Sequence, residues 1–230
     1  MANIISDIML QFLFRSNTAK NLLKIIYNIK NREVLIKKQS KYWIHKKKDN
    51  YLINFHPVLN FDKFQNAHKC FSKNYKPKNG DVIFDVGAGL GQEMVYFSKL
   101  IGERGKIFSI ESDPRLFSVL RKLVHLNKLN NVYLFNAFFY TQNNTKITSK
   151  LSSINDWMSN SINKKKGKNL ESKTITIDYL IKKYNIKKIN FAKFNIEGSE
   201  VNLSKGNSLF LKLCMNITIS FHDFLEGKNY

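Results

Sequence analysis

The sequence contains few of the residues that divide or cross-link a chain. Its 230 residues include only three prolines, ten glycines and two cysteines. So few prolines and glycines leave no Pro/Gly-rich linker, which indicates one compact domain with an N-terminal extension. Cys70 and Cys214 lie far apart and form neither a C-x-x-C pair nor a metal-ligand spacing. A disulfide framework and a cysteine metal site are therefore disfavoured, and we expect a reduced, cytoplasmic protein without a bound metal.

Acidic residues are also scarce. The chain has 17 of them against 38 basic residues, which gives a formal net charge of +21. Such a charge by itself suggests nucleic acid or an anionic membrane as a partner. However, lysine is spread along the whole chain, and the concentrated basic runs, at 45–48 and 163–168, are typical of solvated loops. There is no zinc-finger spacing and no RNP-type aromatic motif, so a nucleic-acid partner is not expected.

No apolar run at the start of the chain is long enough to span a bilayer. Residues 1–14 are partly apolar, but a spanning helix needs about 20 apolar residues. This stretch also lacks a basic beginning and contains Asp7. Neither a signal peptide nor a transmembrane helix is therefore predicted.

Apolar residues recur close to the helical period over residues 3–30. This spacing predicts one helix, or two helices broken near residues 15–18. Packing of the apolar stripe on the domain is favoured. A peripheral membrane contact is the alternative, with Lys20, Lys24 and Lys30 near the lipid headgroups. Residues 31–79 carry no pattern that places their elements.

From Gly80 onward, short apolar runs alternate with amphipathic segments. This alternation predicts an α/β fold with a mostly parallel sheet and helices on both faces. The expected helices are 92–102, 115–129 and 178–185, and the expected sheet strands are 81–87, 105–112, 131–139, 187–198 and 214–222. A short strand is also expected from residue 173, running into the helix that Asp178 opens. The polar stretch 141–173, which contains Trp157, is expected to be a lid or acceptor loop, or else a surface insertion.

A polar residue stands at the end of each expected strand of the sheet. Because ligands of open parallel sheets bind beyond the carboxyl ends of the strands, these side chains mark a candidate site. They are Asp85, Glu111, Asn136, Glu197 and His222.

The first strand leads into a glycine loop, Gly87-Ala88-Gly89-Leu90-Gly91. Gln92 stands where the dinucleotide fingerprint G-x-G-x-x-G has its third glycine, so a pyrophosphate ligand is disfavoured. Asp85, just before the loop, suits a cationic ligand group. Glu111, after the next strand, can accept hydrogen bonds from both hydroxyls of a ribose. A ribose joined to a cationic tail describes S-adenosylmethionine (SAM) better than NAD.

The motifs GDVIFDVGAGLGQ, IFSIESDP, TITIDYL, INFAKFNIEGSE and ISFHDF follow one another along the chain. In this order the sequence resembles the FkbM family of SAM-dependent methyltransferases over about residues 75–225. The resemblance implies a Rossmann-like methyltransferase domain over 75–230. The helical spacing near the start of the chain predicts that the preceding segment, 1–74, is a helical extension packed on this domain. The cofactor-binding residues that it implies are Asp85, Gly87, Ala88, Gly89, Gly91, Glu111, Asp113, Asn136 and Ala137.

The resemblance also implies candidate catalytic residues. Glu197 matches the glutamate of the family's D-x-E-G motif near the transferred methyl group, and His222 matches a polar position after the fifth strand. Glu200 is a third candidate for a general base. Structural alternatives stay open: His222 as a buried structural histidine, Glu200 as a first-turn carboxylate that complements the helix dipole.

Two further structural alternatives concern the proposed cofactor residues. Asp113, followed by Pro114, has the residue types of a helix start. Asn136 can simply end its strand.

The sequence departs from the family pattern in two places. Asn195 replaces the aspartate of the motif after the fourth strand. The sequence also ends at Tyr230, soon after the fifth strand, whereas the usual methyltransferase sheet closes with a C-terminal β-hairpin. We therefore expect either that this hairpin is lacking or that the chain is truncated.

The acceptor is constrained mainly by motifs that the sequence lacks. There is no [DN]-P-P-[YFW] after the fourth strand, as adenine amino-methylation would need, and no Pro-Cys nucleophile, as cytosine C5 chemistry would need. The resemblance implies O-methylation of a hydroxyl on a sugar, a glycolipid or a small molecule. A catalytically degenerate fold that only binds partners is the second hypothesis, and an RNA methyltransferase is the third.

Overall fold

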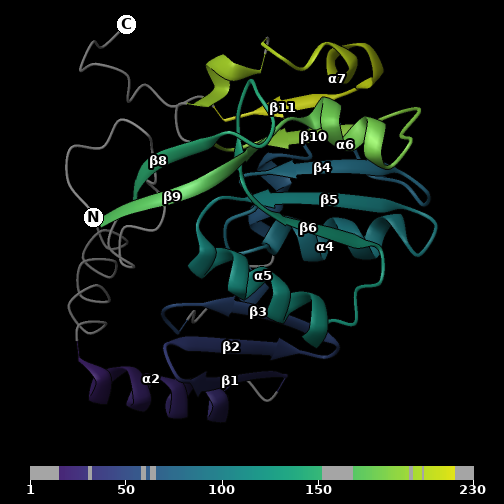
Figure 1. Ribbon diagram of the computed structural model, residues 1–230. Helices are drawn as coiled ribbons and strands as arrows, with labels where there is room; N and C mark the ends of the chain where they lie inside the picture. The colour runs from purple at the N-terminus through teal and green to yellow at the C-terminus, as the bar shows by residue number, and fades with distance from the viewer. Residues whose placement is uncertain are drawn as a thin grey trace, which may run out of the picture. The chain divides into compact units, whose positions relative to one another are not determined.

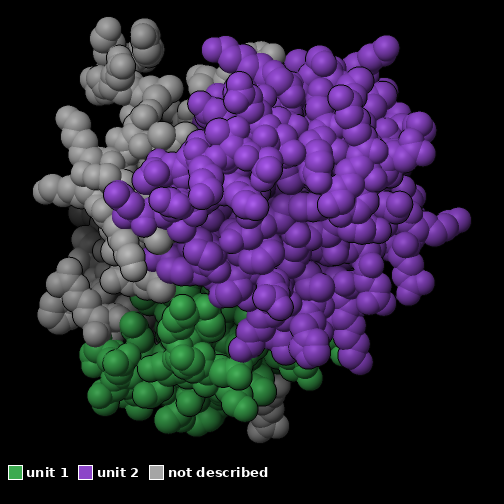
Figure 2. Space-filling view, in the orientation of Figure 1, with its two compact units in different colours: residues 1–66 green, residues 67–230 purple. Residues whose placement is uncertain are grey.

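The computed structural model describes residues 16–30, 33–57, 61–62, 66–151, 168–196, 199–203 and 205–220. The chain divides into two compact units, residues 1–66 and 67–230, which are coloured separately in Figure 2. The boundary thus lies a few residues before the one expected from the sequence.

Unit 1 contains one described helix and a small antiparallel sheet. Helix α2 spans Asn17–Lys30, and the sheet has the order β1-β2-β3, with strands Val34–Gln39, Tyr42–Lys47 and Asn50–Asn54. Side chains alternate between buried and exposed along β1, as expected of a sheet with one covered face.

The expectation of a helical extension over 1–74 is therefore wrong for these three strands. The two turns between them are each two residues long and contain no glycine. Ser40 (φ 55°) and Lys48 (φ 52°) adopt the left-handed conformation that glycine usually supplies in such turns. The usual sequence signal of a tight hairpin, Asn-Gly or Asp-Gly, is missing, and the pattern could not be recognised. Packing of the extension on the core stays a prediction.

Unit 2 is built on the parallel sheet predicted from the sequence (Figure 1). The strand order is β11-β10-β4-β5-β6, and every neighbouring pair is parallel. The strands span Val82–Val86 (β4), Lys106–Glu111 (β5), Val132–Asn136 (β6), Phe191–Phe194 (β10) and Ile217–Ile219 (β11). All five expected strands are thus present, each shorter than its apolar run in the sequence.

Helices cover both faces of this sheet, which confirms the Rossmann-like arrangement. On one face lie α4 (Gln92–Ile101) and α5 (Pro114–Leu126), where Phe97 of α4 meets Phe191 of β10 edge to face at 5.7 Å between ring centroids. On the other face lie α6 (Ile177–Lys183) and α7 (Ser208–Leu213). Leu180 and Phe210 from these helices pack in one buried cluster with Phe84 of β4.

The polar stretch 141–173 is largely strand where the structure describes it. Strands β8 (Lys146–Leu151) and β9 (Lys168–Ile175) form an antiparallel ladder, and β9 also pairs with the short strand β7 (Phe138–Phe139). In Figure 1 these two arms extend away from the main sheet. The expectation of a loop is therefore wrong for β8 and for residues 168–172 of β9, whereas the short strand expected from residue 173 is the end of β9. Trp157 lies outside the described residues.

Two further expectations concern a membrane-spanning helix and the C-terminal hairpin. None of the helices in the described part of the chain has both the length and the apolar character that a membrane span requires. Strand β11 ends at Ile219, and residues 221–230 lie outside the described part, so the expectation about a C-terminal hairpin stays a prediction.

Candidate cofactor-binding site

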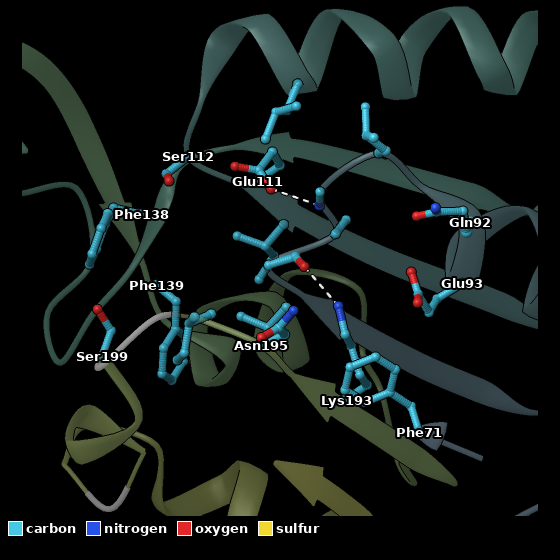
Figure 3. Close-up of a pocket in the computed structure, with 18 of the residues that line it drawn as sticks. Phe71, Gln92, Glu93, Glu111, Ser112, Phe138, Phe139, Lys193, Asn195 and Ser199 are labelled. Atoms are coloured by element: carbon cyan, nitrogen blue, oxygen red, sulfur yellow. Dashed lines mark hydrogen bonds between the residues drawn. The ribbon is translucent and has the colours of Figure 1, made fainter. Parts of the chain in front are cut away.

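A cavity of about 290 Å³ opens at the carboxyl ends of β4, β5 and β10 (Figure 3). This volume is close to the lower end of the roughly 300–1,000 Å³ typical of small-molecule sites. Its walls come from segments far apart in the sequence: the loop after β4, the end of β5, residues 137–139 after β6, and the end of β10. This is the edge of the sheet at which the sequence analysis expected a ligand.

The glycine loop forms one wall because its backbone crosses the sheet edge very closely. The N–H groups of Gly87 and Ala88 donate to the carbonyl oxygen of Ile110, at 2.9 and 3.1 Å. Gly87 has φ +74°, and a Cβ built there would lie 2.0 Å from the carbonyl oxygen of Asn195. A side chain at Gly87 is thus excluded both by backbone conformation and by space.

Glu111 stands opposite this loop and is held by two backbone donors. Its Oε2 accepts from the N–H of Gly89 and its Oε1 from the N–H of Asp113, both at 2.8 Å. Burial raises the pKa of Glu111 to about 7, against the opposing effect of these two hydrogen bonds. The carboxyl group is therefore fixed in orientation and titrates near neutral pH.

A buried ion pair lies beneath the loop. Asp85 and Lys193 are register partners on β4 and β10, and the Lys193 Nζ lies 3.0 Å from Oδ1 of Asp85. The same ammonium donates to the carbonyl oxygen of Gly87 at 2.7 Å and lies 5.1 Å from the ring centroid of Phe71. Lys193 therefore connects the strand, the loop and one aromatic wall.

The charges of this cluster determine the protonation of Lys193. Burial lowers its pKa, but the carboxylates of Asp85 and Glu93 raise it more, so the net shift is upward and the side chain stays charged. Glu93, in the first turn of α4, is itself buried. Burial is the largest effect on the pKa of Glu93, and together with the neighbouring Asp85 it outweighs the opposing effect of Lys193. The pKa of Glu93 is therefore raised above its usual value.

Carboxyl groups outnumber cations at the cavity. Glu93 and Glu111 line it, and Lys193 is the one basic residue among the described lining residues. Asp85 is fully buried behind the loop, and its carboxylate already balances the positive charge of Lys193. The cavity is therefore suited to a ligand with a cationic group.

The structure brings together five of the nine predicted cofactor residues. Those that line the cavity are Gly87, Ala88, Gly89, Glu111 and Ala137. Asp85 acts one layer behind, through Lys193. Gly91 instead allows helix packing, since a Cβ there would lie 2.6 Å from a methyl group of Leu120 on α5.

The remaining two predicted cofactor residues have structural contacts and do not line the cavity. Asp113 caps α5 by accepting from the backbone N–H of Arg115 at 2.8 Å, and it pairs with the guanidinium of the same residue. Asn136 donates from its side chain to the carbonyl oxygens of Glu111 and Ser112, at 2.8 and 3.2 Å. The contacts of Asp113 are thus those of a residue at a helix start, and the contacts of Asn136 are those of a residue that ends its strand.

The candidate catalytic residues are described only in part. Glu197 and His222 lie outside the described residues. Glu200 is buried in the short 3-10 helix η3 (Ser199–Asn202), where its Oε1 accepts from the backbone N–H of Ile196 at 3.3 Å. Its neighbour Ser199 lines the cavity, whereas Glu200 itself does not.

Sequence reasoning missed several lining residues. Lys193 could have been recognised as a site residue, because it stands inside the buried run Phe191–Phe194 and a charged residue on a buried strand requires a partner. Phe71 lies in the unpatterned part of the chain and had no signal. Phe138 and Phe139 were assigned only to the third strand, and the structure shows that both line the cavity.

Over part of its length the chain is similar to curated methyltransferases. The protein-L-isoaspartate O-methyltransferase of Fervidobacterium nodosum is 36% identical over 55 residues, which cover 24% of this chain and 28% of that protein. A probable cobalt-precorrin-6B C(15)-methyltransferase of Sulfolobus acidocaldarius is 38% identical over 53 residues, 23% of this chain and 28% of that protein. The chain thus spans less than a third of the length of these curated relatives.

Among solved structures, the methyltransferase FkbM of Methylobacillus flagellatus is 16% identical, with a TM-score of 0.41. That alignment covers 59% of this chain and 31% of the other. A family model described as the methyltransferase FkbM domain matches residues 85–229, which is more than half of the chain and includes the glycine loop, Glu111 and Lys193. The chain therefore belongs to the FkbM methyltransferase family.

Proposed function

We propose that the cavity binds SAM and that the protein is a SAM-dependent methyltransferase. The observation that carries the proposal is the excess of buried carboxyl groups, Glu93 and Glu111, at a glycine loop on the carboxyl edge of the sheet. In this assignment Glu111 accepts hydrogen bonds from the ribose hydroxyls. Gly87 and Gly89 let the ligand approach the backbone closely. The carboxyl excess balances the positive charges of the sulfonium and the ammonium.

One group at the cavity has hydrogen-bonding capacity that a ligand can use. Asn195 lines the cavity, and its buried Oδ1 accepts no hydrogen bond from the described residues. Because buried polar atoms normally have partners, this acceptor supports a ligand with an N–H or O–H donor.

We further propose that the acceptor is a hydroxyl group of a sugar, glycolipid or small molecule. SAM supplies a methyl group that its sulfonium charge already activates. The protein's part is then to align the acceptor oxygen and to remove its proton. The aromatic rings of Phe71, Phe138 and Phe139 and the hydroxyl of Ser199 line the same cavity and can hold such an acceptor. Glu197, Glu200 and His222 stay candidates for the base.

Replacing Glu111 by glutamine should weaken SAM binding about tenfold or more, since a charged acceptor contributes roughly 1.5–3 kcal/mol per hydrogen bond. Calorimetric titration of the purified chain with SAM measures this, with NAD as the competing ligand. Glu103→Gln, at an exposed glutamate, is the matched control and should bind as the wild type does. Equal affinities for SAM in all three proteins, or tighter binding of NAD, would contradict the assignment.

SAM affinity should also increase with pH between 6 and 8. The pKa of Glu111 is raised to about 7, and the ionised form is the one that accepts from both ribose hydroxyls. Below pH 7 the group must first lose a proton, so affinity should fall by up to about tenfold per pH unit. Titrations at pH 6, 7 and 8 test this, and the dependence should disappear in Glu111→Gln. A flat wild-type profile would be inconsistent with a role for this carboxylate.

One observation favours a second candidate function. Asn195 stands where the family has an aspartate, so a carboxylate contact is missing at the cavity. A catalytically degenerate fold would bind SAM without transferring its methyl group. Incubation with methyl-labelled SAM and a panel of saccharides distinguishes the two, because only the enzyme labels an acceptor.

A further inference from the structure

Helix α2 exposes a continuous apolar stripe. Leu22, Ile25, Ile26 and Ile29 are each between 42% and 71% exposed. Their spacing of i, i+3, i+4 and i+7 places all four on one face of the helix. A single exposed leucine is ordinary, but four large aliphatic side chains on one face indicate a surface that contacts something else.

The stripe is not the face by which α2 is held in unit 1. Asn28 holds the helix against the edge strand β1: its amide nitrogen donates to the carbonyl oxygen of Ile36 at 3.0 Å, and its Oδ1 accepts from the N–H of Ile36 at 2.9 Å. The four aliphatic residues of α2 are called the α2 surface below.

The electrical charge of this region is strongly positive. The described residues between 16 and 62 include nine lysines against three acidic residues, a net charge of +6. Two of the three acids, Glu33 and Asp62, pair with the same lysine, Lys47, at 3.9 and 2.8 Å. Helix α2 contains no acidic residue. The other lysines of the region are therefore poorly compensated.

Some of this charge lies directly beside α2. The Lys38 ammonium is 3.5 Å from the Oδ1 of Asn17, in the first turn of the helix. Burial lowers the pKa of Lys20, also on α2, and the positive charge of Lys38 lowers it further. The two ammonium groups therefore add to one positive field next to the helix.

We propose that the α2 surface binds an anionic lipid bilayer. An apolar stripe on a helix without acidic residues, in a lysine-rich setting, is the pattern of a helix that lies in the membrane interface. At 14 residues α2 is too short to cross the hydrocarbon core, which needs about 20. A second copy of the chain is a poorer occupant, because it would bring the same positive charge to the contact.

The test uses the full chain with vesicles of phosphatidylcholine alone or mixed with phosphatidylglycerol, followed by sedimentation. We expect binding to the mixed vesicles at least about tenfold tighter than to the neutral ones, and weakening by salt. The double variant Ile25→Asn/Ile29→Asn should lose this binding. Its control is Leu211→Asn/Met215→Asn, at exposed apolar residues of unit 2, which should bind as the wild type does.

Three results would overturn the proposal. They are equal binding to neutral and anionic vesicles, unchanged binding of the Ile25/Ile29 variant, and a wild-type dimer that this variant converts to a monomer without any vesicle binding. Circular dichroism and SAM titration of each variant verify that the protein is folded. Because α2 is not part of the cavity, a failure here would leave the proposed SAM site unaffected.

Discussion

Replacing Lys193 by methionine should lower the free energy of unfolding by about 3–5 kcal/mol, the usual cost of removing one partner of a buried ion pair. Asp85 has no solvent exposure, and its described ion pair is with Lys193 at 3.0 Å. Without the ammonium, a buried carboxylate is left uncompensated. The Gly87 carbonyl also loses its 2.7 Å donor, so the loop loses a fixed point and SAM binding should fall as well.

Denaturant titration of the variant measures the first effect, and a charge-neutral double variant identifies its cause. Asp85→Asn/Lys193→Met should recover part of the lost stability, because it removes both charges together. Lys106→Met, at an exposed lysine of β5, should change stability by no more than about 0.5 kcal/mol. If the loss of stability in the double variant equals the sum of the losses in Lys193→Met and Asp85→Asn, the ion pair is not the reason.

Replacing Gly87 by alanine should lower the free energy of unfolding by about 2–5 kcal/mol. The left-handed backbone contributes about 1–2 kcal/mol and the overpacking about 1–3 kcal/mol. The new Cβ would lie 2.0 Å from the carbonyl oxygen of Asn195, which is backbone and cannot rotate away. Since relief requires the loop and the end of β10 to separate, SAM binding should be lost even in the folded fraction.

The chain offers a matched control for the steric part of this effect. Gly80 also has a positive φ, +88°, but a Cβ there would meet nothing within 4 Å. Gly80→Ala should therefore cost only the backbone contribution, about 1–2 kcal/mol. Thermal unfolding and SAM titration of both variants provide the comparison. Similar losses in the two would mean that contact with Asn195 is unimportant.

Much of unit 2 could be predicted because each of its main-sheet strands is visible in its own stretch of sequence. Strands such as Val82–Val86 and Lys106–Glu111 are mostly buried. Strands buried on both faces appear as continuous apolar runs. The glycine loop and Glu111 lie at the carboxyl ends of such runs, so their meeting follows from the parallel topology alone.

Other strands could not be predicted, because their pattern is weak or polar. The turns at Ser40 and Lys48 have no glycine, and strand β8 and the first part of β9 lie within a stretch rich in asparagine, serine, threonine and lysine. In such segments the backbone pairing determines the strand. The pairing partner, such as Lys173 for Lys146, is not marked in the local sequence.

The sequence by itself determined the α/β class, the sheet edge that holds the site, and the two features facing each other there, the glycine loop and Glu111. Only the tertiary structure decided which polar residues face the cavity. Asp113 and Asn136 are taken up by a helix cap and by contacts between strand ends. Lys193 reaches Asp85 because β10 pairs with β4 in one register, across more than 100 residues of chain. Such a pairing arises from packing of the whole sheet, so no local pattern could reveal it.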